Sequence, residues 1–292
     1  MTNIQLEIYI TFESCNKTSW LHKISDCVSR YRSSRNKRFI LDFVSSIKTS
    51  DLFPFHLVTI ANLIQYLFDI GNKVFISQDN NKKVFDYIYN QLYFSEYWSN
   101  GKNHVDVKGG DDIFNLWRIV DSEKDLYVPR VENYFKRNYF HNRDLSVISQ
   151  IMTEAYYNVF DHAQAQNNAF SLIMYKKETY MLHAAISDFG IGIANSVRKF
   201  EPTIQSDRDA LAKAIEDNFT VRSTERNRGF GLSNILNGST SARIFSGTAL
   251  VVKRNDKTNI VGTNFSFPGT LIYFEVDLSK TEEEEVINDF EW

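Results

Sequence analysis

The chain has 292 residues, of which 43% are apolar and 14% aromatic, so it can bury a sizeable core and is not disordered as a whole. Lysine and arginine number 33 and aspartate and glutamate 36, a formal net charge of −3 that does not indicate nucleic-acid binding. The two cysteines form neither a disulfide framework nor a metal cluster, which favours a reducing, cytoplasmic location. We expect no signal peptide and no membrane span, because no apolar run approaches the roughly 18 residues that a span needs.

The first 110 residues alternate strand-like and helix-like patterns. Apolar and polar residues alternate over 4–12, and short apolar runs cover 39–44 and 74–76, which predicts three strands. Helices are predicted over 20–28, from 51 or 54 to 69, and over 84–92, with Gly71 ending the second. Strands that alternate with helices predict an α/β layer with partly parallel pairing.

Turn-rich stretches at 98–104 and 108–112 mark a boundary. We therefore predict four parts: a smaller α/β domain (1–110), a connecting strand and helix (111–140), a second domain (141–279) and an acidic tail (280–292). The strand of the connecting part is expected at 113–120 and its helix at 129–139. The second domain is expected to contain, in order, a helix over 144–163, strands over 169–176 and 180–187, helices over 191–200 and 207–218, a glycine turn with a helix, and three or four strands that end at Leu278.

Three features of the second domain carry candidate chemistry. The first is Glu154, Asn158 and His162, which are spaced four residues apart and so form one polar stripe on a helix. A carboxylate, an amide oxygen and an imidazole in this arrangement suit a metal–phosphate group. By itself the pattern is more typical of a solvent-facing stripe.

The second feature is the sequence Asp188-Phe-Gly190-Ile-Gly192, directly after an apolar strand. The glycines permit a sharp turn and close approach of a ligand, and the acid can accept a hydrogen bond from an exocyclic amine such as that of adenine. The plain alternative is a strand-to-helix turn.

The third feature is Arg226-Asn-Arg228-Gly229-Phe-Gly231, where basic residues lead into a glycine turn that opens a helix. Free backbone N–H groups and the positive end of a helix dipole favour phosphate binding there. The plain alternative is a flexible loop with scattered arginines.

Together the three features resemble the GHKL superfamily of ATP-binding domains, which includes gyrase, Hsp90, histidine kinases and MutL. Residues 154–162 look like its N-box, 188–192 like its first glycine box and 229–231 like its second. Phe267-Pro-Gly-Thr270 looks like the entry to its last strand. The resemblance covers roughly residues 144–278 and implies an α/β sandwich, with a mixed, largely antiparallel sheet, helices on one face, and ATP beneath a mobile lid.

By position in these boxes, the resemblance implies that Asn158 gives its side-chain oxygen to Mg²⁺ and that Asp188 accepts from the adenine amine, with Thr270 lining that pocket. Glu154 corresponds to the base that orients water in ATPase members, although phosphotransferases also carry an acid there. His162 is expected near the phosphates. Backbone approach to the nucleotide is implied at four glycines, namely Gly190, Gly192, Gly229 and Gly231.

The chain has no Walker-type phosphate loop, so Mg²⁺, backbone N–H groups and cations of the lid must meet the phosphate charge. Residues 220–228 are polar and lack apolar anchors, as a lid that orders over ATP would be. The candidates for phosphate contact are Arg222, Arg226 and Arg228.

The first domain is similar to STAS-like domains, the anti-sigma-factor antagonist fold, through Phe39-Ile-Leu-Asp-Phe, the helix after it and Gly71-Asn-Lys-Val-Phe-Ile. The serine that this family phosphorylates corresponds to the region of Thr49 and Ser50, but its Asp-Ser-(Ser/Thr)-Gly signature is absent. We favour a packing or partner-recognition domain. A basic cluster between residues 30 and 38 is more typical of a solvated loop than of a binding surface.

Two kinase interpretations are rejected. Asp188-Phe-Gly190 spells the metal-binding triplet of eukaryotic-type protein kinases, but the glycine-rich nucleotide loop of those kinases does not occur upstream. A sensor histidine kinase needs a two-helix element with a phospho-accepting histidine, and His22, His56 and His104 lie in or just after an α/β pattern instead.

The leading hypothesis is therefore a Mg-ATP-binding protein that hydrolyses ATP slowly or uses it as a conformational switch to regulate a protein partner. The alternatives are a protein-serine/threonine kinase of the anti-sigma-factor type and a scaffold that binds nucleotide without chemistry. A homodimer is compatible with each hypothesis, and a membrane or nucleic-acid partner is not indicated.

Overall fold

The computed structural model describes residues 7–106, 112–120, 123–141, 143–159, 169–216 and 231–282. Its first part is a three-stranded parallel sheet in the order β1-β2-β3. The strands β1 (Glu7–Phe12), β2 (Arg38–Phe43) and β3 (Lys73–Ile76) are linked by the helices α1 (Lys17–Tyr31) and α2 (Pro54–Asp69). The predicted parallel pairing of alternating strands and helices is confirmed.

A short helical segment follows β3. The predicted helix over 84–92 is divided there into α3 (Lys82–Asp86) and a π-helical turn (Tyr87–Gln91), and α4 (Phe94–Ser99) comes next. Tyr93, with φ of 55°, is left-handed and separates the turn from α4, which explains why the helical pattern does not continue as one element.

The second part is a five-stranded sheet in the order β4-β5-β6-β8-β7. Its elements in chain order are β4 (Ile113–Arg118), α5 (Lys124–Asn138), α6 (Ser146–Tyr157), β5 (Ala169–Lys176), β6 (Met181–Asp188), α7 (Ile193–Phe200), α8 (Asp207–Ala214), α9 (Gly231–Gly238), β7 (Ser241–Arg254) and β8 (Lys257–Asp277). The α/β class is confirmed, but the expected mixed sheet is wrong, because every neighbouring pair of these strands is antiparallel. Connections as short as those between β5 and β6 and between β7 and β8 permit only antiparallel pairing.

The end of the chain forms two long strands where three or four shorter ones were predicted. Phe267-Pro-Gly-Thr270, expected as the entry to the last strand, lies within β8. The pairing register of β7 and β8 shifts there, around Ser246, Gly247 and Ala249. Bulges of this kind accommodate glycine and proline without ending the strand.

The helix predicted over 129–139 begins earlier, at Lys124, so Pro129 lies inside α5 rather than at its start. Tyr127 and Val128, which precede the proline, are buried in the core, and this burial supports the additional turn.

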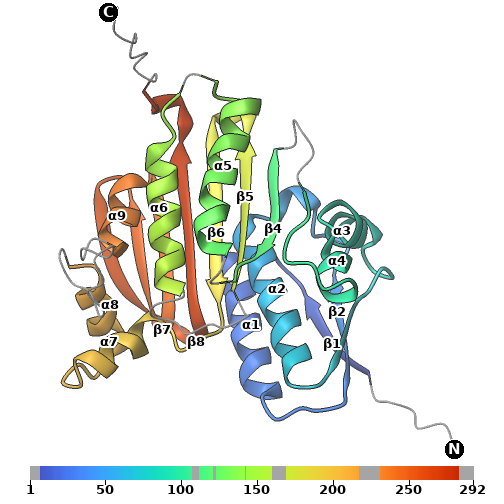
Figure 1. The fold of residues 1–292 in the computed structure, drawn as a ribbon. Helices are drawn as coiled ribbons and strands as arrows, with labels where there is room; N and C mark the ends of the chain where they lie inside the picture. The colour runs from blue at the N-terminus through green and yellow to red at the C-terminus, as the bar shows by residue number, and fades with distance from the viewer. Residues whose placement is uncertain are drawn as a thin grey trace, which may run out of the picture.

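Both faces of the five-stranded sheet are covered. Figure 1 shows α5, α6 and α9 on one face, where they share an apolar core with α7 and α8. The described helices of the second domain thus lie on one face of its sheet, as expected. The other face is covered by helices of the first part, because α1 packs on β8, and α2 packs on β5 and β6. The order of layers is therefore the parallel sheet, α1 with α2, the antiparallel sheet, and the outer helices.

The predicted boundary near residue 110 stays a prediction, but the apolar core is continuous across it. One cluster joins residues of α1 and α2 with Leu172, Phe245 and Tyr273 of the antiparallel sheet. Among the described residues, no helix has the length and apolar character that crossing a bilayer requires.

His56 of α2 is a buried histidine whose two ring nitrogens are both hydrogen-bonded. Its Nδ1 accepts a hydrogen bond from the Phe53 N–H (2.9 Å), and its Nε2 donates to the Cys15 carbonyl (3.0 Å). Burial lowers the pKa of His56 from 6.5 to about 4.

This shift predicts a loss of stability in mild acid. The unfolded chain binds a proton at His56 below pH 6.5 and the folded chain only below about 4, so the stabilisation is complete above pH 6.5 and is lost progressively down to about pH 4. The loss amounts to about 3 kcal/mol. We expect urea unfolding of His56→Gln to show a smaller dependence on pH in this window than the wild type. His22→Gln, on the exposed face of α1, is the control and should retain the wild-type dependence; equal slopes in all three proteins would contradict the prediction.

Candidate functional site

The C-terminal end of α6 carries the polar residues of the predicted stripe. Asn158 follows the last residue of α6 with helical dihedral angles, and its Nδ2 donates to the Glu154 carbonyl (2.7 Å). This bond engages the Nδ2 of Asn158, and Oδ1 is the acceptor atom of the same amide group. Half-burial raises the pKa of the Glu154 carboxyl above its usual value, and a hydrogen bond from Asn234 partly offsets this.

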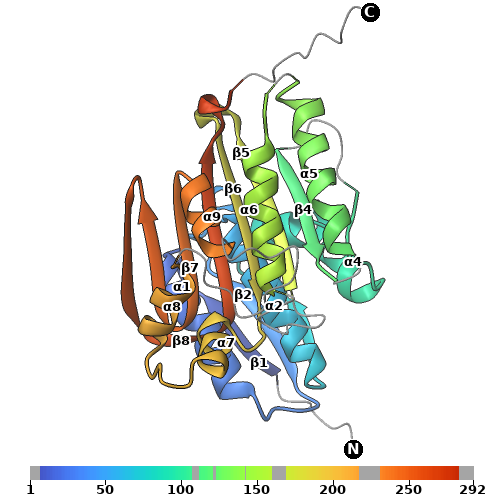
Figure 2. The same cartoon turned by 60° about the vertical axis from the view of Figure 1, so that its left-hand side comes forward.

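Two glycines allow α9 to lie close against α6, beside which it appears in Figures 1 and 2. A Cβ atom on Gly231 would lie 3.4 Å from both Glu154 Oε2 and Asn158 Nδ2. At the other end of α9, a Cβ atom on Gly238 would lie 2.9 Å from Ile151 Cδ1, closer than packed carbon atoms approach. The start of α9 is thus held against Glu154 and Asn158.

Asp188, the last residue of β6, is fully buried, and its Oδ1 accepts a hydrogen bond from the Gly190 N–H (2.7 Å). Thr270 pairs with it across the β6–β8 ladder. Burial raises the pKa of the Asp188 carboxyl to about 7, and the Gly190 N–H and Thr270 lower it only in part. Within the described ranges, neither Asp188 Oδ2 nor Thr270 Oγ1 makes a hydrogen bond of acceptable geometry. Both atoms are buried, so both are unsatisfied polar groups.

The turn after Asp188 is fixed by close backbone packing. Gly192 begins α7 with φ of 77°, and a Cβ atom on it would lie 2.8 Å from both Gly269 O and Ser246 Oγ. Gly269 has φ of 125°, and a Cβ atom there would lie 2.2 Å from Asp188 O. Positive φ and the lack of a side chain are therefore both required where β8 crosses the end of β6.

These groups lie at one end and on one face of the antiparallel sheet. Asp188 pairs with Ala169, the first residue of β5. Figures 1 and 2 show α6 ending near the same end of the sheet, where α7 lies. Side chains alternate along a strand, so Asp188 and Thr270 share the face of Ile186 and Ile272, which belong to the core beneath α6 and α9. The structure thus brings Glu154, Asn158 and Gly231 to the end of the sheet where Asp188 and Thr270 lie.

Several of the predicted site residues lie outside the described residues, namely His162, Arg222, Arg226, Arg228 and Gly229. The larger part of the acidic tail also lies outside them. In the described part of the chain, no group of three His, Cys, Asp or Glu side chains could hold a metal ion.

Sequence reasoning missed Asn234, whose Nδ2 donates to Glu154 Oε1 (3.3 Å). The available signal was its position three residues after Gly231, which places it on the same side of α9. It also missed Ser246, whose Oγ accepts from the Ala194 N–H at the start of α7 (3.1 Å); no spacing in the sequence relates these two residues.

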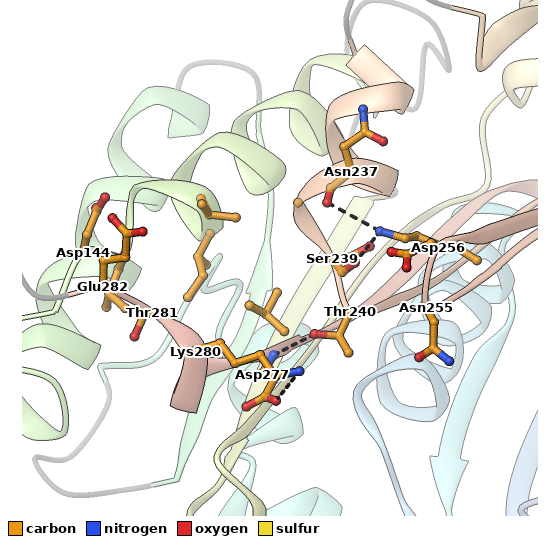
Figure 3. Close-up of a pocket in the computed structure, with 16 residues that line it drawn as sticks. Asp144, Asn237, Ser239, Thr240, Asn255, Asp256, Asp277, Lys280, Thr281 and Glu282 are labelled. Atoms are coloured by element: carbon orange, nitrogen blue, oxygen red, sulfur yellow. Dashed lines mark hydrogen bonds and ion pairs between the residues drawn. The ribbon is translucent and has the colours of Figure 1, made fainter.

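A pocket of about 600 Å³ is separate from this site (Figure 3). It lies between the start of α6 and the end of α9, and Asp144 and Asn237 line it. Lys253 Nζ donates there to the Ser239 carbonyl (2.7 Å) and to the last carbonyls of α9, so the ammonium group caps that helix. A second open pocket of about 660 Å³ borders the site itself, along Gly190, Ile191 and Gly269.

In the first part of the chain, Thr49 and Ser50 lie in a short 3-10 turn that precedes α2, and Ser50 is exposed. Of the basic cluster, Arg30 pairs with Asp26 (3.0 Å) and Arg38 with Glu7 (3.0 Å). These exposed ion pairs are typical of a solvated surface.

Comparison of the sequence with protein-family models gives no match, and comparison with curated proteins gives none either.

The packing of Gly269 gives a stability prediction. Gly269→Ala would force a Cβ atom onto Asp188 O in addition to the cost of positive φ, so we expect the free energy of unfolding in urea to fall by about 3 kcal/mol or more. Gly101→Ala is the control, because Gly101 also has positive φ (65°) but no atom within 4 Å of the added Cβ, and it should cost about 1 kcal/mol. Equal losses in the two variants would show that the close approach at Gly269 is absent.

Proposed function

We propose that this protein binds Mg-ATP at the common end of α6, α9 and β6, as a GHKL-type domain, and that ATP hydrolysis or ATP-driven switching regulates a protein partner. The observation that carries the proposal is the convergence of Glu154, Asn158 and Gly231 with a buried carboxyl group at Asp188. They come from three segments far apart in the sequence, in the order and on the elements that the resemblance to the superfamily implies.

Asp188 supports the adenine part of the proposal. The carboxyl group is fully buried and one of its oxygens lacks a hydrogen bond, which costs free energy of folding unless a ligand donates that bond. An exocyclic amine supplies the donor that Oδ2 lacks, and Thr270 Oγ1 offers a second polar contact. The open pocket beside Gly190 gives access to this part of the sheet.

The end of α6 supports the phosphate part. Asn158 Oδ1 is a neutral, hard oxygen of the kind that Mg²⁺ accepts, and phosphate oxygens and water would complete the octahedron. The start of α9 adds backbone N–H groups and the positive end of its dipole beside Glu154. Burial raises the pKa of the Glu154 carboxyl. In this proposal Glu154 is the base that orients water toward the γ-phosphate.

The metal assignment predicts the effect of Asn158→Ala. Removing the amide oxygen should abolish the part of the affinity that depends on Mg²⁺ in calorimetric titration with a non-hydrolysable ATP analogue. Asn138→Ala is a matched control, since Asn138 also ends a helix and donates to a carbonyl four residues earlier (Tyr134 O, 2.8 Å). An Asn158→Ala protein that titrates like the wild type would exclude Asn158 as the metal ligand.

The role of Glu154 predicts that Glu154→Gln binds ATP but releases phosphate about 100-fold or more slowly, because the amide cannot act as a base. Glu132→Gln on α5 is the control, since Glu132 is also a partly buried carboxylate and bonds Ser149 away from the site. The measurement is phosphate release by the full chain under saturating ATP. Transfer of label from γ-labelled ATP to a partner or to Ser50, in place of release, would support the kinase alternative. Binding with neither outcome would support the scaffold.

A further inference from the structure

A fully buried asparagine in α2 contacts the strand that carries Asp188. Asn62 is 0% exposed, and its Nδ2 donates to the Ser187 carbonyl (3.2 Å) across the interface between α2 and β6. The neighbours of Asn62 along α2 are aliphatic, and an aliphatic side chain would be buried there without needing a hydrogen-bond partner. The amide therefore links the helix to the Ser187 carbonyl through a hydrogen bond that an aliphatic side chain could not make.

The position of this link matters because Ser187 directly precedes Asp188. The side chains of the two residues point to opposite faces of the sheet, so Asn62 holds the backbone from below while the Asp188 carboxyl faces the α6 side. One turn further along α2, the Tyr66 ring meets Phe189 edge-on at 6.2 Å between centroids. Helix α2 thus contacts the residues on both sides of Asp188.

The turn after Asp188 also contacts β8. The Phe189 ring also packs edge-on against Phe267 at 5.9 Å, while the Gly190 N–H donates to Asp188 Oδ1 (2.7 Å). The turn after β6 is thereby held between α2 and β8. A displacement of α2 by a few tenths of an ångström would be transmitted to the carboxyl group, since the interface is close-packed.

We propose that Asn62 is a positioning residue for the nucleotide site, and that through it the three-stranded sheet and its helices set the affinity and base selectivity of that site. This inference rests on the proposed function for its ligand. By thermodynamic linkage, a partner that binds the parallel sheet and shifts α2 would change nucleotide affinity, and nucleotide would change the affinity for that partner by the same factor.

The test compares two substitutions in α2 in the full chain. Asn62→Leu keeps the volume and removes the bond to Ser187, whereas Thr59→Val removes a buried hydroxyl one turn earlier that bonds Trp20 Nε1 (3.1 Å) within the first part of the chain. In titrations with non-hydrolysable ATP and GTP analogues, Asn62→Leu should lose about fivefold in ATP affinity and most of the preference for ATP over GTP, as expected for weakening one hydrogen bond to a charged group. Thr59→Val should keep both values while losing comparable stability in urea.

A ligand-free measurement separates this inference from the proposed function. Exchange of the Gly190 amide proton, which donates to Asp188 Oδ1, should be several-fold faster in Asn62→Leu than in Thr59→Val. If the wild type binds no nucleotide but the two variants differ in exchange as expected, the proposed function is contradicted. The role of Asn62 in positioning the end of β6 is then retained. Equal exchange in the two variants would overturn the positioning role, as would nucleotide affinities that both variants lower by the same factor.

Discussion

The burial of α2 between two sheets is the packing constraint on which the rest of the structure depends. The helix is apolar around almost its whole circumference, so it is stable only where both sides are covered. The parallel sheet covers one side and the antiparallel sheet the other. The continuous core explains why the first part of the chain lies against β5 and β6 and so reaches the strand that ends at Asp188.

The few polar groups on α2 follow from the same constraint. Each lies in a dry interface and therefore needs a partner of its own, and His56, Thr59 and Asn62 have theirs in different directions. Two of these bonds stay within the first part of the chain, while that of Asn62 crosses to Ser187. The interface therefore transmits a specific backbone position as well as apolar packing.

Glycine determines the candidate site as much as the polar residues do. Gly231 and Gly238 bring α9 against α6, whereas Gly192 and Gly269 bring the start of α7 and the strand β8 against the end of β6. Each contact is at a distance that a side chain would prevent. The two ends of α9 therefore have different polar neighbours. Glu154 lies at the start of α9, and Lys253 caps the last carbonyls of α9 at the other end.

The sequence by itself determined most of the helices and strands, and their alternation in the first part predicted partly parallel pairing. These follow from local periodicity, which the chain encodes directly. Glu154, Asn158 and Asp188 were predicted as polar groups of one candidate site only through the resemblance of their segments to one superfamily. Only the tertiary structure decided that β7 and β8 are two long bulged strands, that α5 begins before Pro129, and that α1 and α2 cover the second face of the antiparallel sheet. It also decided the hydrogen bonds of Asn234 to Glu154 and of Asn62 to Ser187. The partner of such an amide depends on which segment, distant in the sequence, packs against it, and no pattern along the chain specifies that segment.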